Sequence, residues 1–143
     1  MLKFIERIVI FGAGAMGAAY AAFFTDNSNI RVRFAARGDY FSRLDGATIN
    51  VNGQDYTIPV VHPDRVAYPF DLVLVALKHH HLTTPVLNDI NALTGPETLV
   101  LSVMNGLESE KLLGDACGHE KIVSAIAVGI DAVHENSCYR FAN

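Results

Sequence analysis

Three glycines near the start of the chain have a spacing that suits a phosphate-containing ligand. Gly12, Gly14 and Gly17 follow the apolar residues 8–11, and an alanine-rich segment comes directly after them. In a strand-turn-helix, the first glycine permits the tight turn, the second lets a pyrophosphate approach, and the third lets the helix pack closely. The N–H groups and the positive end of the helix then face the phosphates. We therefore predict a dinucleotide site. Its cradle is Gly12, Ala13, Gly14, Ala15, Met16 and Gly17.

The residue after the second predicted strand decides which dinucleotide we expect. Residues 30–36 alternate in polarity as a strand does, and Arg37 follows them, 25 residues after Gly12. Sites for NAD usually place an acid here for the ribose hydroxyls, whereas sites for NADP place an arginine for the 2′-phosphate. We expect NADP (NADPH), with Arg43 adding positive charge. The alternatives are a solvated Arg37, and Asp39 in the ribose role.

Two further strand ends carry polar side chains. Lys78 closes the apolar residues 71–77, and Asn105 follows residues 99–103. Because ligands of an open α/β sheet lie beyond the carboxyl ends of its strands, both residues are candidates for contacts with a ligand. Residues 129–131 lie at a corresponding strand end. Both residues also have a purely structural interpretation: Lys78 as a lysine that flanks a strand, and Asn105 as part of a simple Asn-Gly turn.

The remaining candidates for metal or redox chemistry are histidines and cysteines. His79, His80 and His81 are consecutive, so they do not converge on one ion without unusual backbone, and they have no spaced Asp, Glu or Cys partner. Cys117 and Cys138 are 21 residues apart and form no C-x-x-C pair. We expect no metal site, and reduced thiols rather than a disulfide.

The bulk composition suits one globular domain spanning residues 1–143. Half of the residues are hydrophobic, 18% are charged and the net charge is −4. Without a Lys/Arg cluster, this charge argues against a nucleic-acid partner. Residues 8–24 are uncharged, but they are at the short limit for a membrane span and lack the flanks of a signal peptide. We therefore expect a cytoplasmic protein without a membrane partner.

Strand-like and helix-like segments alternate along the chain, as they do in a doubly wound parallel sheet with helices on both faces. The predicted strands cover residues 8–11, 30–36, 71–77, 99–103 and 122–128, with a strand-like end at 138–141. The predicted helices cover residues 16–24, 41–44, 83–93 and 108–113. Asn52-Gly53 within residues 48–61 predicts a β-hairpin that decorates the main sheet. The predicted fold class is α/β and Rossmann-like, with a mostly parallel sheet.

With these residues in place, the sequence resembles the N-terminal half of the ketopantoate reductases (2-dehydropantoate 2-reductases). The matching segments, in order, are IVIFGAGAMG, the arginine of RFAAR, VLVALK, MNGLESE and the terminal FAN. The resemblance implies NADPH-dependent reduction of a 2-oxo acid, ketopantoate, to pantoate in the route to pantothenate and coenzyme A. It would assign the pyrophosphate to the glycine turn, the 2′-phosphate to Arg37, and contacts with both cofactor and substrate to Lys78 and Asn105.

The sequence also departs from the family pattern. Glu108 stands where a small residue is common, and the histidines after Lys78 replace an aromatic residue or glutamine, which leaves the substrate open. The family's proteins are about twice as long. Their helical half carries the lysine that protonates the carbonyl, so the resemblance implies no catalytic residue in this chain. We expect a cofactor domain that binds but hardly turns over.

Two other functions remain open at this point. One is a different NADP-dependent hydroxyacid dehydrogenase that shares this first domain. The other is a nucleotide-sensing regulatory domain, as found in ion channels, which has the same size and glycine motif but tends to carry an acid after the second strand. Arg37 and Lys78 count against the sensing domain. Self-association into a homo-oligomer is also open.

Overall fold

The computed structural model describes residues 4–27, 29–104, 107–125, 132–135 and 138–141. Within these residues, the centre is a six-stranded sheet in the order β5-β2-β1-β6-β7-β8, and every neighbouring pair is parallel. The prediction of a Rossmann-like α/β fold is confirmed. The strands are β1 (Arg7–Phe11), β2 (Arg31–Ala35), β5 (Val60–Val61), β6 (Leu72–Val75), β7 (Leu99–Ser102) and β8 (Ile122–Val123).

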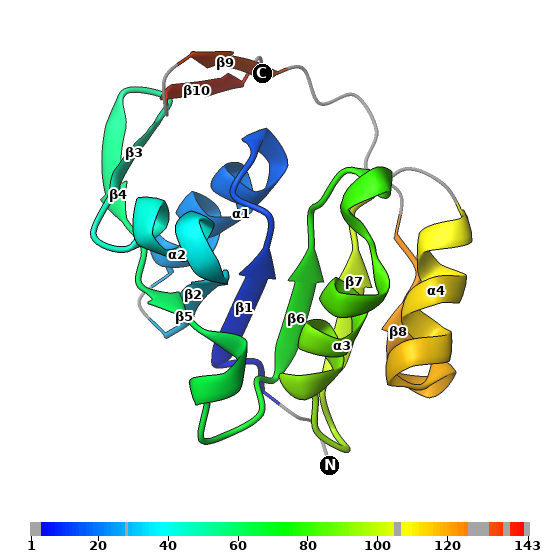
Figure 1. The fold of residues 1–143 in the computed structure, drawn as a ribbon. Coiled ribbons are helices and arrows are strands. Elements are labelled where there is room, and N and C mark those ends of the chain that lie inside the picture. Colours follow the sequence, from blue (N-terminus) through cyan, green and yellow to red (C-terminus); the bar gives the residue numbers. More distant parts are fainter. Residues whose placement is uncertain (1–3, 28, 105–106, 126–131, 136–137, 142–143) are drawn as a thin grey trace.

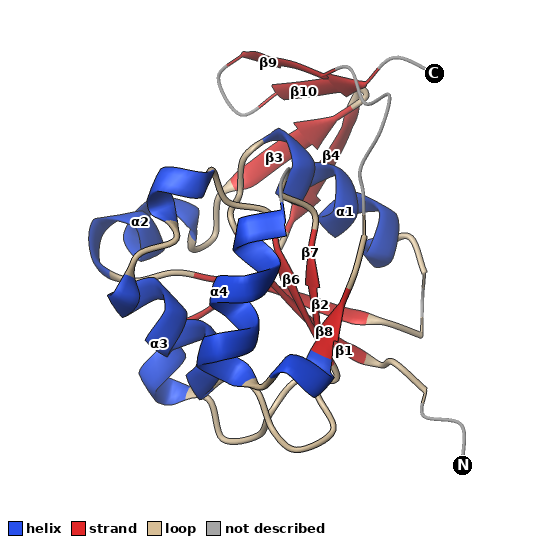
Figure 2. Cartoon of the chain, turned by 90° about the vertical axis from the view of Figure 1, so that its right-hand side faces the viewer, coloured by secondary structure: helices blue, strands red, loops and turns tan. Residues whose placement is uncertain are grey.

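Helices cover both faces of this sheet, with α1 on one side and α3 and α4 on the other (Figures 1 and 2). Among the described residues, no helix has the length and hydrophobicity that crossing a membrane requires. The helices are α1 (Ala15–Thr25), α2 (Gly38–Leu44), α3 (Thr84–Ala92) and α4 (Leu107–Cys117), with single 3-10 turns η1 (Pro63–Arg65), η2 (His79–His81) and η3 (His119–Lys121).

The alternation of side chains along β1 explains this layered arrangement. Ile8 and Ile10 are fully buried on the α1 side, whereas Val9 and Phe11 are buried on the side of α3 and α4. Successive side chains of a strand point to opposite faces, so a strand buried on both faces is apolar throughout. The continuous hydrophobic run of β1 is therefore required by its central position.

A second sheet, of four strands, lies over α1 in the order β4-β3-β10-β9. The hairpin turns at Asn52 and Gly53, both with positive φ. β10 then pairs in parallel with β3, although the two strands are far apart in the sequence. The strands of this sheet are β3 (Thr48–Val51), β4 (Gln54–Thr57), β9 (Ala132–Glu135) and β10 (Cys138–Phe141).

The predicted β-hairpin has the expected turn. It was wrongly assigned to the main sheet, and its second strand was predicted too long. The hairpin joins the second sheet, and the predicted strand over residues 54–61 is divided into β4 and β5. Pro59 lies between them and has no N–H for a ladder. Its carbonyl accepts a hydrogen bond from Phe34 N at 2.9 Å, after which β5 runs parallel to β2.

The predicted strand over residues 122–128 is also shorter than expected. β8 ends at Val123, and the Ser124 hydroxyl donates to the Glu110 carboxylate at 3.2 Å. The Ala125 N–H donates to the same carboxylate at 3.4 Å, so the chain turns toward α4 rather than along β7. Residues 126–128 lie outside the described residues. α4 itself extends to Cys117, beyond the predicted end at residue 113.

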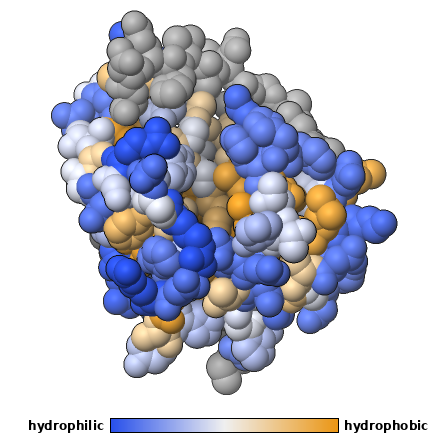
Figure 3. Space-filling model, in the orientation of Figure 1, coloured by the Kyte–Doolittle hydropathy of each residue, from blue (hydrophilic) through white to orange (hydrophobic). Residues whose placement is uncertain are grey.

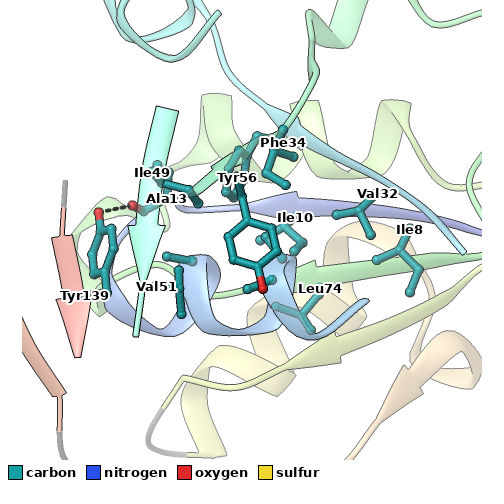
Figure 4. Packing of buried hydrophobic residues seen from close by; sticks show 14 of the residues in the cluster. Ile8, Ile10, Ala13, Val32, Phe34, Ile49, Val51, Tyr56, Leu74 and Tyr139 are labelled. Atoms are coloured by element: carbon teal, nitrogen blue, oxygen red, sulfur yellow. Dashed lines mark hydrogen bonds between the residues drawn. The ribbon is translucent and has the colours of Figure 1, made fainter. Parts of the chain in front are cut away.

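Tyr139 of β10 ties the second sheet to the glycine turn (Figure 4). Its buried hydroxyl donates to the Ala13 carbonyl at 2.8 Å, across 126 positions of sequence. Ile49, Val51 and Tyr56 of the same sheet belong to the core shared with α1. The second sheet therefore supports the glycine turn from the side of α1.

Candidate functional site

A crevice lies at the carboxyl ends of the central strands. The chain leaves β1 for β2 on one side and leaves β6 for β7 on the other, so the strand order reverses between β1 and β6. In open α/β sheets, ligands bind at this reversal. The crevice has a volume of about 620 Å³, within the range of small-molecule sites. This face of the molecule is hollowed at its centre, with hydrophobic residues inside the hollow (Figure 3). The lining of the crevice combines apolar side chains such as Phe11 and Leu77 with the charged side chain of Arg37.

Two of the three motif glycines are required by close packing of the backbone. Gly12 has φ of +105°, and a Cβ there would overlap the Ala76 carbonyl at the end of β6. A Cβ on Gly17 would overlap the Gly12 carbonyl. Any side chain at either position would push α1 or β6 away from the turn. The predicted roles of these two glycines in the turn and in helix packing agree with this geometry.

Gly14 differs, because a Cβ placed on it would meet no protein atom within 4 Å. It is the N-cap of α1, and among the described residues no side chain caps this helix and no acid stands in its first turn. A helix N-terminus has unpaired N–H groups and a partial positive charge. The space beside Gly14 thus fits a phosphate group, which is the role expected of the second glycine.

Tyr40 is a second neighbour of the glycine turn, and it was not singled out from the sequence. The Ala13 N–H donates to the Tyr40 hydroxyl at 3.2 Å. Arg43 lies over the Tyr40 ring at 5.4 Å from its centroid, and both side chains line the crevice. Among the described residues, Arg43 has no carboxylate within ion-pair distance. The structure therefore places a second cation in the lining of the crevice, and its contribution to binding a 2′-phosphate stays a prediction.

Arg37 lies at the end of β2, where the sequence places it, and it holds two carboxylates. Nη1 and Nη2 donate to the two oxygens of Asp64, both at 2.7 Å. Nε and Nη2 donate to the two oxygens of Asp89, at 2.7 and 2.6 Å. Asp64 comes from η1 and Asp89 from α3, so the group joins three elements around the crevice. We call Arg37, Asp64 and Asp89 the carboxylate clamp.

The clamp is partly exposed and strongly paired. The side chain of Asp89 is 16% exposed, against 41% for Arg37 and 64% for Asp64. The hydrogen bonds from Arg37 hold the pKa of the Asp64 carboxyl below its ordinary value, and burial opposes this only in part. No local sequence pattern marks the clamp, because its acids lie 27 and 52 positions after Arg37.

The end of β6 presents Lys78 and the histidines in different directions. Lys78 is exposed at the N-cap of η2, while His80 and His81 line the crevice with their rings 4.0 Å apart. His79 Nε2 lies 3.6 Å from a carboxylate oxygen of Glu108. In the described part of the chain, no three His, Cys, Asp or Glu side chains are grouped for a metal ion. Asn105 and residues 129–131 lie outside the described residues.

Comparison with known proteins agrees with the fold and with the geometry of the crevice. The family described as Ketopantoate reductase PanE/ApbA matches residues 8–140. The chain belongs to this family. A curated relative, the 2-dehydropantoate 2-reductase of Mesorhizobium japonicum, is 32% identical over 105 residues, which are 71% of this chain and 32% of the relative. The chain thus spans about a third of that relative's length.

Solved structures share the fold. The 2-dehydropantoate 2-reductase of Geobacter metallireducens is 29% identical with a TM-score of 0.73, covering 94% of this chain and 46% of that one. A D-mandelate dehydrogenase in complex with NADH and anilino(oxo)acetate has a TM-score of 0.77 at 24% identity, covering 96% of this chain and 46% of that one. This chain is a Rossmann domain of a family of NAD(P)-dependent oxidoreductases.

The clamp generates a prediction about acid stability. A carboxyl with a lower pKa in the folded than in the unfolded chain stabilises the fold above the unfolded-state pKa, and this contribution is lost as the pH falls through the folded-state value. Arg37→Gln should raise the pKa of Asp64 and reduce the loss of stability below about pH 4. Carboxyl-detected NMR titration and unfolding at several pH values measure both effects.

Arg33→Gln is the matched control, since Arg33 lies on β2, just before Arg37, and outside the clamp. It should leave the titration of Asp64 unchanged. An Asp64 pKa that does not rise in Arg37→Gln would show that the pair is not formed in solution.

Proposed function

We propose that this chain is the NADPH-binding part of a reductase that converts a 2-oxo acid, ketopantoate, to its 2-hydroxy acid. The pyrophosphate would lie at the glycine turn and the 2′-phosphate at Arg37. Lys78 and Asn105 are the proposed contacts on the nicotinamide and substrate side. The supporting observation is the uncapped N-terminus of α1, with open space at Gly14, at the strand-order reversal.

The chemistry divides between the bound cofactor and the protein. NADPH, when bound, supplies a hydride to the carbonyl carbon. The residues of this chain would bind the dinucleotide, orient it through the turn and α1, and shield one side of it with the apolar side chains that line the crevice. The resemblance to ketopantoate reductases assigns the proton donor to their helical half.

A second candidate is an NADH-dependent 2-hydroxyacid dehydrogenase. The carboxylate clamp favours this candidate, because both acids accept hydrogen bonds from the arginine that would otherwise bind a 2′-phosphate. A nucleotide-sensing domain is less well supported, since the family match covers residues 8–140 of the chain. Measuring the two cofactors side by side separates the two enzymatic candidates.

Gly14→Val tests the phosphate site. The valine side chain would fill the space beside the N-terminus of α1, so binding of NADPH and NADH should be lost. The fold should stay cooperative, because the added atoms meet no protein neighbour near Cβ. Thermal unfolding with and without NADPH measures both properties, since a bound ligand raises the melting temperature.

Gly17→Ala is the contrasting variant. Its Cβ would overlap the Gly12 carbonyl, so this variant should lose stability even without ligand. A Gly14→Val protein that keeps the full rise in melting temperature with NADPH would contradict the proposed phosphate site.

Arg37→Ala tests the cofactor choice. If the guanidinium binds the 2′-phosphate, the change should weaken NADPH binding by about 1.5 kcal/mol and leave NADH binding nearly unchanged, because NADH lacks that group. Fluorescence titration of both cofactors measures this difference. Arg33→Ala, which changes an arginine of the preceding strand β2, should alter neither affinity. Equal losses for both cofactors in Arg37→Ala would exclude the proposed contact.

A turnover measurement tests whether these residues bind the cofactor without supplying the proton donor. The 143-residue chain should bind NADPH without oxidising it in the presence of ketopantoate, because no proton donor has been assigned to these residues. A protein in which the same residues precede a helical half of the ketopantoate reductase type should turn over. Absorbance of NADPH follows both reactions. Substantial turnover by the 143 residues alone would place the proton donor within them, with Lys78 and His80 as first candidates.

A further inference from the structure

The carboxylate clamp occupies both edges of the Arg37 guanidinium that can bind an anion with two parallel hydrogen bonds. A guanidinium has five N–H groups in a planar fork, and its paired edges are Nε with Nη2, and Nη1 with Nη2. Asp89 takes the first edge and Asp64 takes the second. A phosphate can therefore pair with Arg37 in this way only after one carboxylate has left.

The charge of the clamp also opposes a phosphate. One guanidinium and two carboxylates sum to a net charge of −1, and Asp64 and Asp89 both lie against the group that a 2′-phosphate would approach. Like charges this close repel, and a 2′-phosphate is itself anionic. The neutral 2′-hydroxyl of NADH meets no such repulsion and has a proton to donate to a carboxylate.

We propose that Asp64 and Asp89 are specificity-determining residues that compete with a 2′-phosphate for Arg37 and so lower the preference of this chain for NADPH over NADH. The inference rests on the proposed function, since it requires the adenosine end of a dinucleotide at the end of β2. It assigns a role to two acids that neither the glycine motif nor Arg37 itself requires.

The two acids should differ in how strongly they affect the cofactor preference. Asp89 is on the regular helix α3, and its side chain is 16% exposed, so its charge is less screened by water. Asp64 is on the single turn η1, and its side chain is 64% exposed. Neutralising Asp89 should therefore change the cofactor preference more than neutralising Asp64.

The test uses Asp64→Asn, Asp89→Asn and the double variant, because asparagine keeps the shape of aspartate and removes its charge. Calorimetric titration with NADPH and with NADH gives two dissociation constants for each protein. The double variant should bind NADPH about tenfold more tightly relative to NADH than the unchanged chain, which is the range for two partly exposed, well-paired charges. Its affinity for NADH should change by less than about twofold.

Asp45→Asn is the matched control, since Asp45 is an exposed acid at the end of α2 that lies outside the clamp. It removes the same charge and should leave the cofactor ratio unchanged. Thermal unfolding of each variant shows that it is folded. If the double variant is unfolded, Asp89→Asn alone tests the proposal. The affinity for NADPH relative to that for NADH should then rise about threefold.

The outcomes separate this proposal from the proposed function. If the unchanged chain binds both cofactors and the folded variants leave the ratio unchanged or lower it, the role of the two acids is overturned and the dinucleotide site stands. If the unchanged chain binds neither cofactor, the proposed function is overturned, and this inference with it. An equal rise in Asp45→Asn would show a general effect of net charge and would also overturn the role of the clamp.

Discussion

The close approach of α1 to the turn that follows β1 is the constraint on which the site depends. Gly17 lies against the Gly12 carbonyl with no room for a Cβ, and a Cβ on Gly12 would likewise overlap the Ala76 carbonyl. These two contacts bring the first turn of α1 to the carboxyl ends of β1 and β6. Gly12 therefore lines the crevice, and the N-terminus of α1 at Gly14 lies next to the strand-order reversal.

Ala13 shows how the rest of the chain supports that turn. Its N–H donates to Tyr40, on α2, and its carbonyl accepts from Tyr139, on β10. Both polar groups of one turn residue are therefore satisfied by side chains from distant segments, which restricts the turn to one conformation. Such preorganisation lowers the entropic cost of binding a ligand. The second sheet thus contributes to the site without carrying a motif of its own.

The parts of the fold that could be predicted are those marked by a pattern among neighbouring residues in the sequence. The glycine spacing predicts a strand-turn-helix and the unbroken hydrophobic run of residues 71–77 predicts a buried strand, each from neighbouring residues alone. The structure contains both elements, with β6 limited to residues 72–75. The clamp has no such signal, because Asp89 is one acid among others on a helix until the fold brings it to Arg37. The second sheet was missed for a similar reason: its parallel pairing of β3 with β10 depends on tertiary packing rather than on propensity.

The pairing of β10 with β3 gives the fold an order of assembly. β1, α1 and β2 are consecutive, so their contacts close short loops, whereas the contact between Ala13 and Tyr139 spans 126 positions. Loop-closure entropy delays contacts of such large sequence separation. During synthesis, the glycine turn leaves the ribosome long before its last hydrogen-bond partner has been made. The hydrogen bond from Tyr139 to the turn can therefore form only after nearly the whole domain has been synthesised.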